Sequence, residues 1–281
     1  MTLLRKIARW AFVALALCSC SKKVTVITVD EVHFTASVKS YSTKASDSGF
    51  ENGDKVRIVA GYPIDETSVG AVNGNSLLLD TPMHWTKDQT ASTTFAAIYQ
   101  AGKVADAKTS LTYDLLAGGK HDYSAHNQLL TAVRTVAPLT TVDLVFSHPF
   151  SKMVLDITNN LSGDAISKVE ITDLVMKGTV NLTEKSLDLS GSPTKFEPFK
   201  LSSGQYAAVV MPQTAAPEVV VTTTSGVVYK FELDASFVFE AGYAYSASLT
   251  LNPLPNPDPV VFTFHVTPWE DGGSLDYELE E

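Results

Sequence analysis

The side chains that could hold a metal ion or act as catalytic bases are few and scattered along the chain. There are six histidines, and only His121 and His126 are close in sequence. They are five residues apart, which is not the i, i+4 spacing that places two zinc-binding histidines on one face of a helix. We therefore interpret the histidines as surface or core residues whose ring nitrogens are satisfied by hydrogen bonds.

The other motifs that could carry chemistry are incomplete. Glu270–Asp276 loosely resembles a calcium loop, but it lacks the alternating acidic residues and the closing glutamate of that motif, so it is predicted to be an acidic turn. The adjacent carboxylates of Asp30 and Glu31 do not indicate a specific activity, because the sequence does not show which groups lie near them in space. The sequence has neither a G-x-S-x-G elbow nor a glycine loop that binds phosphate. We predict no enzyme, no metal and no cofactor, and a hydrolase with an unrecognised site is the weakest alternative.

The aromatic residues allow two interpretations. Trp85, Trp269 and the tyrosines could form a platform on which a sugar ring stacks. The same residue types are also common in the core and at the edges of β-sandwiches, where they bury large areas. We favour packing, and glycan binding stays open as the alternative.

Both cysteines of the chain lie at the end of an apolar N-terminal run. Arg5, Lys6 and Arg9 precede this run, which is too short to span a bilayer and is typical of a signal peptide. Cys20 follows a leucine three residues earlier and a serine one residue earlier, and this spacing resembles the lipobox of bacterial lipoproteins. Cys20 is therefore predicted to carry the lipid, and no disulfide can form in the mature chain.

The charge of the mature chain limits its partners. Removal of residues 1–19 takes away three basic residues and no acidic ones, so the formal net charge moves from −10 to −13. An acidic surface of this kind argues against nucleic acid and against electrostatic attraction to anionic lipid. We expect the acyl chain on Cys20 to be the only attachment to the membrane.

Apolar and polar residues alternate over most of the mature sequence. A period of two places one set of side chains on one face of a sheet, which is the pattern of a half-buried strand. These stretches are rich in Val, Thr, Phe and Tyr, and Asn-Gly and Gly-Gly turns separate them, so we predict an all-β fold. The predicted strands include residues 32–38, 55–60, 94–99, 142–146, 227–233, 243–251 and 260–267.

The length of the chain favours two domains. We place the boundary near Pro138, because Leu129–Ala137 closes a first set of strands and Val142–Phe146 opens a second. One short turn of helix is predicted within His126–Val133. The predicted division is a lipoprotein signal peptide at 1–19, an N-terminal β-sandwich domain at 20–138 and a C-terminal β-sandwich domain at 139–281.

Six segments in a fixed order resemble the fimbrillin family of Bacteroidetes. Each is a strand joined to a turn and is weak alone, but six in order behind a lipobox are fairly specific. The segments are Phe50–Ile58 (F-x-x-G-D-x-V-x-I), Trp85 with Thr94–Tyr99, Leu144–Lys152 (L-x-F-x-H-x-F-S-K), Ala208–Thr214 with its Pro-Gln, Phe239–Tyr245 (F-x-x-G-x-x-Y) and Val266–Trp269.

The resemblance implies two transthyretin-like β-sandwich domains in tandem. It also implies a structural or accessory subunit of surface fimbriae with a role in cell adhesion, held in the outer membrane by its lipid. In that family a protease removes the first strand of an exported lipoprotein, and the groove accepts a strand from the next subunit. Donor-strand exchange of this kind is β-augmentation, in which main-chain hydrogen bonds give affinity and alternate side chains give register.

The sequence departs from the family at the cleavage step, which often uses an arginine. No arginine lies between Cys20 and Arg57, and Arg57 falls inside a predicted strand. Lys39 and Lys44 are the basic residues that follow the first long strand. An uncleaved anchor or accessory subunit and processing by a different protease both stay open. The runner-up function is a surface lipoprotein that binds glycan or host protein through a β-sandwich without polymerising.

The lipobox spacing predicts the result of replacing each cysteine. Cys20→Ala should leave unprocessed precursor or protein without lipid, because the acyl acceptor is lost, whereas Cys18→Ala should change little. Mass spectrometry of the membrane fraction measures both. Loss of acylation in Cys18→Ala alone would place the lipid on the other cysteine.

Overall fold

The computed structural model describes the chain from Asp30 to Trp269, with gaps. The predicted signal peptide, Cys18, Cys20, Lys44 and the acidic turn predicted at Glu270–Asp276 lie outside the described residues. The described residues are 30–39, 50–102, 104–106, 108–117, 120–184, 186–233, 237–253 and 260–269.

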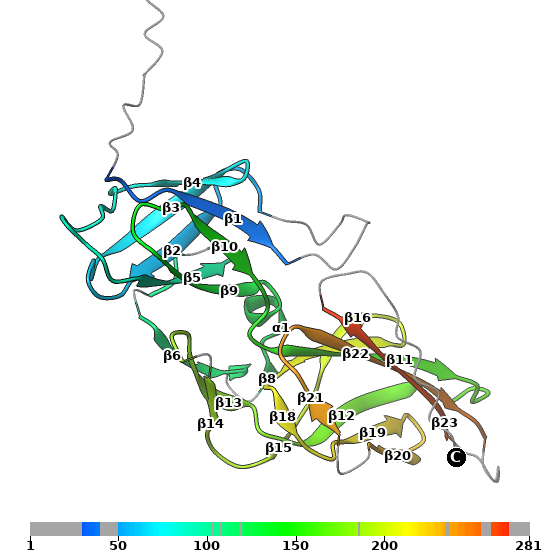
Figure 1. Ribbon diagram of the computed structural model, residues 1–281. Helices are drawn as coiled ribbons and strands as arrows, with labels where there is room; N and C mark the ends of the chain where they lie inside the picture. Colours follow the sequence, from blue (N-terminus) through cyan, green and yellow to red (C-terminus); the bar gives the residue numbers. More distant parts are fainter. Residues whose placement is uncertain are drawn as a thin grey trace, which may run out of the picture.

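The first half of the chain forms a seven-stranded sheet (Figure 1). The strand order is β10-β1-β4-β3-β2-β5-β9; β1 pairs in parallel with β10, and every other pair of neighbouring strands in this sheet is antiparallel. Thr131 in β9 and Ser147 just after β10 exchange two backbone hydrogen bonds of 2.9 Å, so the two ends of this order approach each other and the sheet curls. The strands are β1 (Phe34–Val38), β2 (Lys55–Ala60), β3 (Thr67–Asn73), β4 (Ser76–Leu79), β5 (Thr93–Gln100), β9 (Leu129–Val136) and β10 (Val142–Phe146).

The second half is built on two larger sheets. A five-stranded sheet has the order β16-β17-β11-β22-β23, and a four-stranded sheet has the order β15-β12-β19-β20. The first contains β11 (Ser151–Asn159), β16 (Phe199–Ser202), β17 (Gln205–Val210), β22 (Tyr243–Leu251) and β23 (Val260–Pro268). The second contains β12 (Ile166–Leu174), β15 (Thr194–Phe196), β19 (Glu218–Thr223) and β20 (Val228–Glu232).

Shorter elements complete the described structure. A three-stranded sheet has the order β14-β13-β6, and two pairs of short strands lie beside it and the larger sheets. These elements are β6 (Ser110–Asp114), β7 (Leu116–Ala117), β8 (Lys120–His121), α1 (Tyr123–His126), β13 (Lys177–Asn181), β14 (Ser186–Leu189), β18 (Gln213–Thr214) and β21 (Val238–Phe239).

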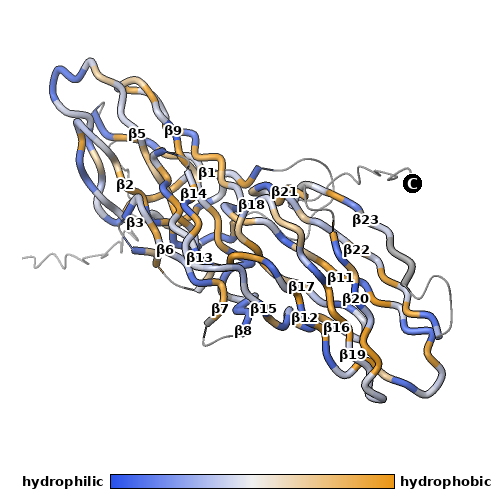
Figure 2. The backbone as a smooth tube through the Cα atoms, turned by 90° about the horizontal axis from the view of Figure 1, so that it is seen from below, coloured by the Kyte–Doolittle hydropathy of each residue, from blue (hydrophilic) through white to orange (hydrophobic). Residues whose placement is uncertain are grey.

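Alternation along the strands builds two hydrophobic cores. Figure 2 shows apolar and polar residues alternating along many of the strands. We call the cluster around Phe95 and Ile58 the N-terminal core. The C-terminal core contains Leu155 of the five-stranded sheet and Ile171 of the four-stranded sheet, so these two sheets bury their apolar faces against each other.

The two cores share strands. In β5, Phe95 and Ala97 belong to the N-terminal core, whereas Ala96 and Ile98 belong to the C-terminal core. β6 comes from the first half of the chain but pairs antiparallel with β13 of the second half. The halves are therefore joined through β5, which is buried on both faces, and through an antiparallel sheet that contains strands from both halves of the chain.

The predicted all-β class is confirmed, and two other predictions differ from the structure. The strand Val142–Phe146 does not open a second sheet: as β10 it pairs with β1, and its side chains at positions 142, 144 and 146 fill the N-terminal core. The division at Pro138 stays a prediction. The pairing of β10 with β1 favours a boundary between the two halves after Phe146. The helix expected within His126–Val133 lies earlier, at Tyr123–His126, because Leu129–Val136 pairs with β5.

The shared strands predict one cooperative unfolding transition. Ile98→Ala should lower the free energy of unfolding by about 3 kcal/mol, because it leaves a cavity at a fully buried site. Two variants are compared, one that keeps Trp85 but not Trp269 and one that keeps Trp269 but not Trp85. Urea unfolding, followed through the environment of the remaining tryptophan, should have the same midpoint in both. Tyr62→Ala, at a side chain that is 77% exposed, is the matched control and should change stability by less than about 0.5 kcal/mol. Two separate transitions would show that the halves are independent.

Candidate functional site

The first strand lies between two strands that are distant from it in sequence. β1 is flanked by β4 and β10 in the curled sheet (Figure 1). The segment that contains β1 donates from the amide of Val32 to the carbonyl of Met83 at 2.9 Å and from the amide of Ala36 to the carbonyl of Asn75 at 2.9 Å. On its other side, the amide of Lys39 donates to the carbonyl of Phe146 at 2.8 Å. β1 is therefore a central strand that satisfies backbone groups on both neighbours.

The inward side chains of this strand fill the N-terminal core. Val32, Phe34 and Ala36 are 3%, 3% and 4% exposed. The ring of Phe34 meets the ring of Phe95 edge to face, with centroids 5.3 Å apart. Burial of a side chain such as Val or Phe contributes about 1.5–3 kcal/mol, so the slot that β1 fills is strongly apolar.

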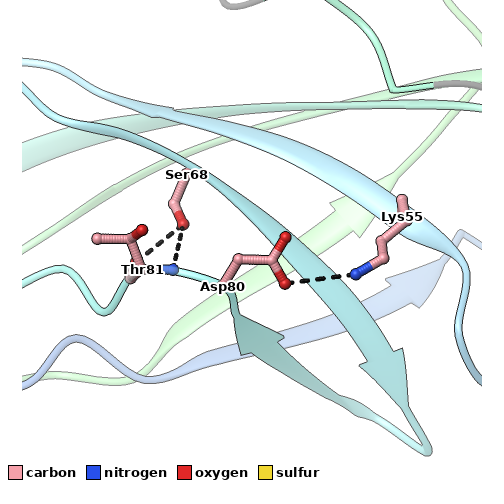
Figure 3. Close-up of polar contacts among 4 residues, drawn as sticks. All are labelled: Lys55, Ser68, Asp80 and Thr81. Carbon is pink, nitrogen blue, oxygen red and sulfur yellow. Dashed lines mark hydrogen bonds and ion pairs between the residues drawn. The ribbon is translucent and has the colours of Figure 1, made fainter.

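The β4 wall of this slot has supports that do not involve β1. β4 pairs antiparallel with β3. Just beyond β4, the amide of Thr81 donates to Ser68 Oγ at 3.3 Å, and Ser68 Oγ donates to the carbonyl of Thr81 at 2.8 Å (Figure 3). Lys55 Nζ lies 3.3 Å from Asp80 Oδ1 in the same region. These contacts fix the chain after β4 to β3 and β2.

The β10 wall is also held from its far side. The paired backbone groups of Thr131 and Ser147 tie the end of β10 to β9. The carbonyl of Leu129 lies 3.1 Å from His148 Nδ1, which adds a side-chain contact to the same strand. Both walls of the slot are therefore held by contacts that do not involve β1.

Comparison with known proteins identifies the family. The family model described as fimbrillin-like matches residues 43–269. The chain belongs to the fimbrillin-like family. No curated protein is similar enough in sequence to match it.

Solved structures share the fold of this fimbrillin-like chain. A candidate cell adhesion protein from Bacteroides uniformis is 16% identical with a TM-score of 0.64, over 85% of this chain and 99% of that one. One from Bacteroides ovatus is 15% identical with a TM-score of 0.61, over 91% and 100%. The tip fimbrial protein Mfa3 from Porphyromonas gingivalis, with a C-terminal truncation, is 10% identical with a TM-score of 0.53, over 85% and 100%. At these identities the likeness concerns the fold.

The histidines of the fimbrillin-like chain do not converge on a metal site. His121 Nε2 lies within 2.9 Å of the backbone nitrogen and oxygen of Val209, and His126 Nδ1 lies 2.8 Å from the carbonyl of Asp122. Burial lowers the pKa of His121 to about 4, so its ring is neutral at pH 7. No group of three potential metal ligands occurs among the described residues.

The two tryptophans pack against other rings, as the sequence analysis favours. Trp85 is 5% exposed and its ring meets the edge of Phe95 with centroids 5.9 Å apart, so it cannot serve as a sugar platform. The ring of Trp269 stacks on His148 with centroids 4.0 Å apart and an interplanar angle of 8°. Trp269 thereby contacts the segment that joins β10 to β11.

Several residues that shape the site were not singled out from the sequence. Ser68 and Thr131 have this role through contacts with residues 13 and 16 positions away, and neither residue type has a distinctive motif there. Phe50 was recognised only as the first residue of a motif. Its ring packs against those of Tyr99 and Phe146, with centroids 5.1 and 4.9 Å apart, so it fixes the chain to β5 and β10.

Among the residues that the structure describes, no helix is both long and apolar enough to cross a bilayer.

The half-buried ring of His148 predicts a pH dependence of stability. Burial lowers its pKa to about 4, against 6.5 for an ordinary histidine, and the positive charge of Lys152 acts in the same direction. Between these values the unfolded chain binds the proton and the folded chain does not, so stability falls as the pH falls from 6.5 to 4. The contribution is about 2 kcal/mol between pH 7 and pH 5.

In His148→Gln the loss of stability between pH 7 and pH 5 should be smaller by this amount, measured by urea unfolding at each pH. The control is His33→Gln, at an exposed side chain, which should keep the parent slope. An unchanged slope in His148→Gln would contradict the assignment.

Proposed function

We propose that this chain is a structural or accessory subunit of surface fimbriae that joins other subunits by donor-strand exchange and acts in cell adhesion without catalysis. The observation that carries the proposal is the position of β1, a central strand whose two walls are each held by other strands. Its family supports the fimbrial role. Within this proposal Cys20 carries a lipid that attaches the subunit to the outer membrane, and each half of the chain is a transthyretin-like β-sandwich.

The step that would open the slot is cleavage of the chain between β1 and Phe50. Lys39 follows β1 directly, and Lys44 lies further along the same connection. Phe50 would hold the new N-terminus against β10, because its ring packs on Phe146. The slot would then expose apolar walls and unpaired backbone groups, which a strand from another subunit could satisfy.

Such contacts are heterologous, since the slot of one subunit receives a strand from another. A heterologous contact that does not close on itself produces a filament. If the chain keeps β1, the same slot is filled from within, and the subunit ends a filament or attaches it to the membrane instead of extending it.

A chain that begins near Ala45 tests this proposal. It lacks β1, so the buried surface of Val32, Phe34 and Ala36 is lost, and we expect oligomers or disordered aggregates in place of a monomer. A peptide of residues 30–39 added in trans should bind and restore a monomer with the stability of the parent chain. Sedimentation and thermal unfolding measure both effects.

A peptide with Phe34→Asp and Ala36→Asp is the matched control. It keeps the length and the exposed residues but places carboxylates in the apolar slot, so it should not bind. A shortened chain that stays a well-folded monomer of unchanged stability would contradict donor-strand exchange. It would make the N-terminal segment a tether and would favour a lipoprotein that binds its ligand without polymerising.

A further inference from the structure

A hollow lined by lysines lies at one edge of the second half of the molecule. Its volume is about 600 Å³, and it is open to solvent. Three lysines from three separate strands line it, namely Lys120 of β8, Lys195 of β15 and Lys200 of β16. Because the chain has a formal net charge of −10, a cluster of three lysines differs from its generally acidic composition.

The carboxylates in this lysine-lined hollow are already paired. Glu170 lies 2.8 Å from Lys168 Nζ and 3.2 Å from Lys195 Nζ, and both contacts hold the pKa of Glu170 below its usual value. Glu197 lies 3.5 Å from Lys168 Nζ. Within the described part of the chain, Lys120 and Lys200 form no ion pair. The hollow therefore keeps a net positive charge that favours an acidic partner.

The strand beside the hollow exposes apolar side chains. β16 is an edge strand of its sheet, and Phe199 and Leu201 are each 42% exposed. An edge strand presents unpaired backbone groups to any extended segment that lies alongside it. The surface thus combines positive charge with an apolar strand edge.

The described chain ends close to this surface. Lys152 Nζ lies 5.8 Å from the ring centroids of both Trp269 and Tyr123. The ring of Tyr123 stacks on that of Phe199, with centroids 5.4 Å apart and an interplanar angle of 11°. A short series of contacts therefore connects Trp269, the last described residue, to β16.

The sequence after Trp269 has the complementary chemistry. Residues 270–281 contain six carboxylates and no basic residue. Within them Leu275, Tyr277 and Leu279 alternate with acidic residues, which is the period of an extended segment. Twelve extended residues reach up to about 40 Å, which is more than enough to cross from Trp269 to the hollow.

We propose that segment 270–281 docks on the lysine-lined hollow of its own chain, with its apolar residues against Phe199 and Leu201 and its carboxylates toward the lysines. The occupant is this segment because its charge, its alternation and its point of departure all match the surface. The inference is independent of the proposed function, since it does not involve β1.

Zero-length carbodiimide cross-linking of the full chain tests this docking. It joins carboxylates to amines only when they are in contact, so peptides that link Asp276, Glu278 or Glu280 to Lys120, Lys195 or Lys200 are expected. In an equal mixture of unlabelled and ¹⁵N-labelled protein, each cross-linked pair should carry a single label. Pairs of mixed label would overturn docking within one chain, and absence of these links, or equal linking to the exposed Lys87, would overturn the site.

A variant with half of the carboxylates neutralised gives a second measurement. The triple substitution Asp276→Asn, Glu278→Gln and Glu280→Gln keeps the length of the segment but leaves three of its six carboxylates, so its attraction to the lysines is weakened. Acetylation of Lys120, Lys195 and Lys200 in dilute salt should become about threefold faster than in the parent chain, with Lys87 unchanged as the control. Equal rates in parent and variant would contradict the proposal.

Discussion

The architecture of the first half depends on one insertion, that of Phe34 and Ala36 between β4 and β10. The strand that carries them supplies hydrogen bonds to both neighbours and an aromatic contact to Phe95 in the centre of the N-terminal core. Without it, β4 and β10 have no pairing with each other in the described sheet. The sheet would then be open at a position where the core is apolar, and the proposed strand exchange rests on this feature.

The two halves are coupled around the same region. β5 faces both cores, and β6 leaves the first half to pair with β13. His148, in the joint between β10 and β11, contacts β9 on one side and Trp269 on the other. Shared strands and packed rings therefore connect the two halves around this joint.

Much of this fold can be predicted from alternation alone, because half-buried strands such as 55–60 and 243–251 have a clear period of two. Which strands pair with each other cannot be predicted in the same way. β10 was expected to open a new sheet, but it pairs with β1 about a hundred residues earlier, and the period is the same whichever sheet a strand joins. The contact of His121 with Val209 likewise spans 88 residues. Trp85 was correctly expected to pack, since large aromatic residues in strand-rich sequences usually fill the core.

The opposite directions of β4 and β10 have a consequence for the polarity of a strand that enters the slot in the proposed exchange. β1 runs parallel to β10 and antiparallel to β4. A strand inserted in the reverse direction would also meet one parallel and one antiparallel neighbour, so the hydrogen-bond ladders barely distinguish head from tail. The discrimination falls to side-chain volume, because the site for Phe34 is large and the next inward site, for Ala36, is small. The slot thus accepts a large side chain followed by a small one. A reversed strand would place the small side chain in the large site and the large side chain in the small site.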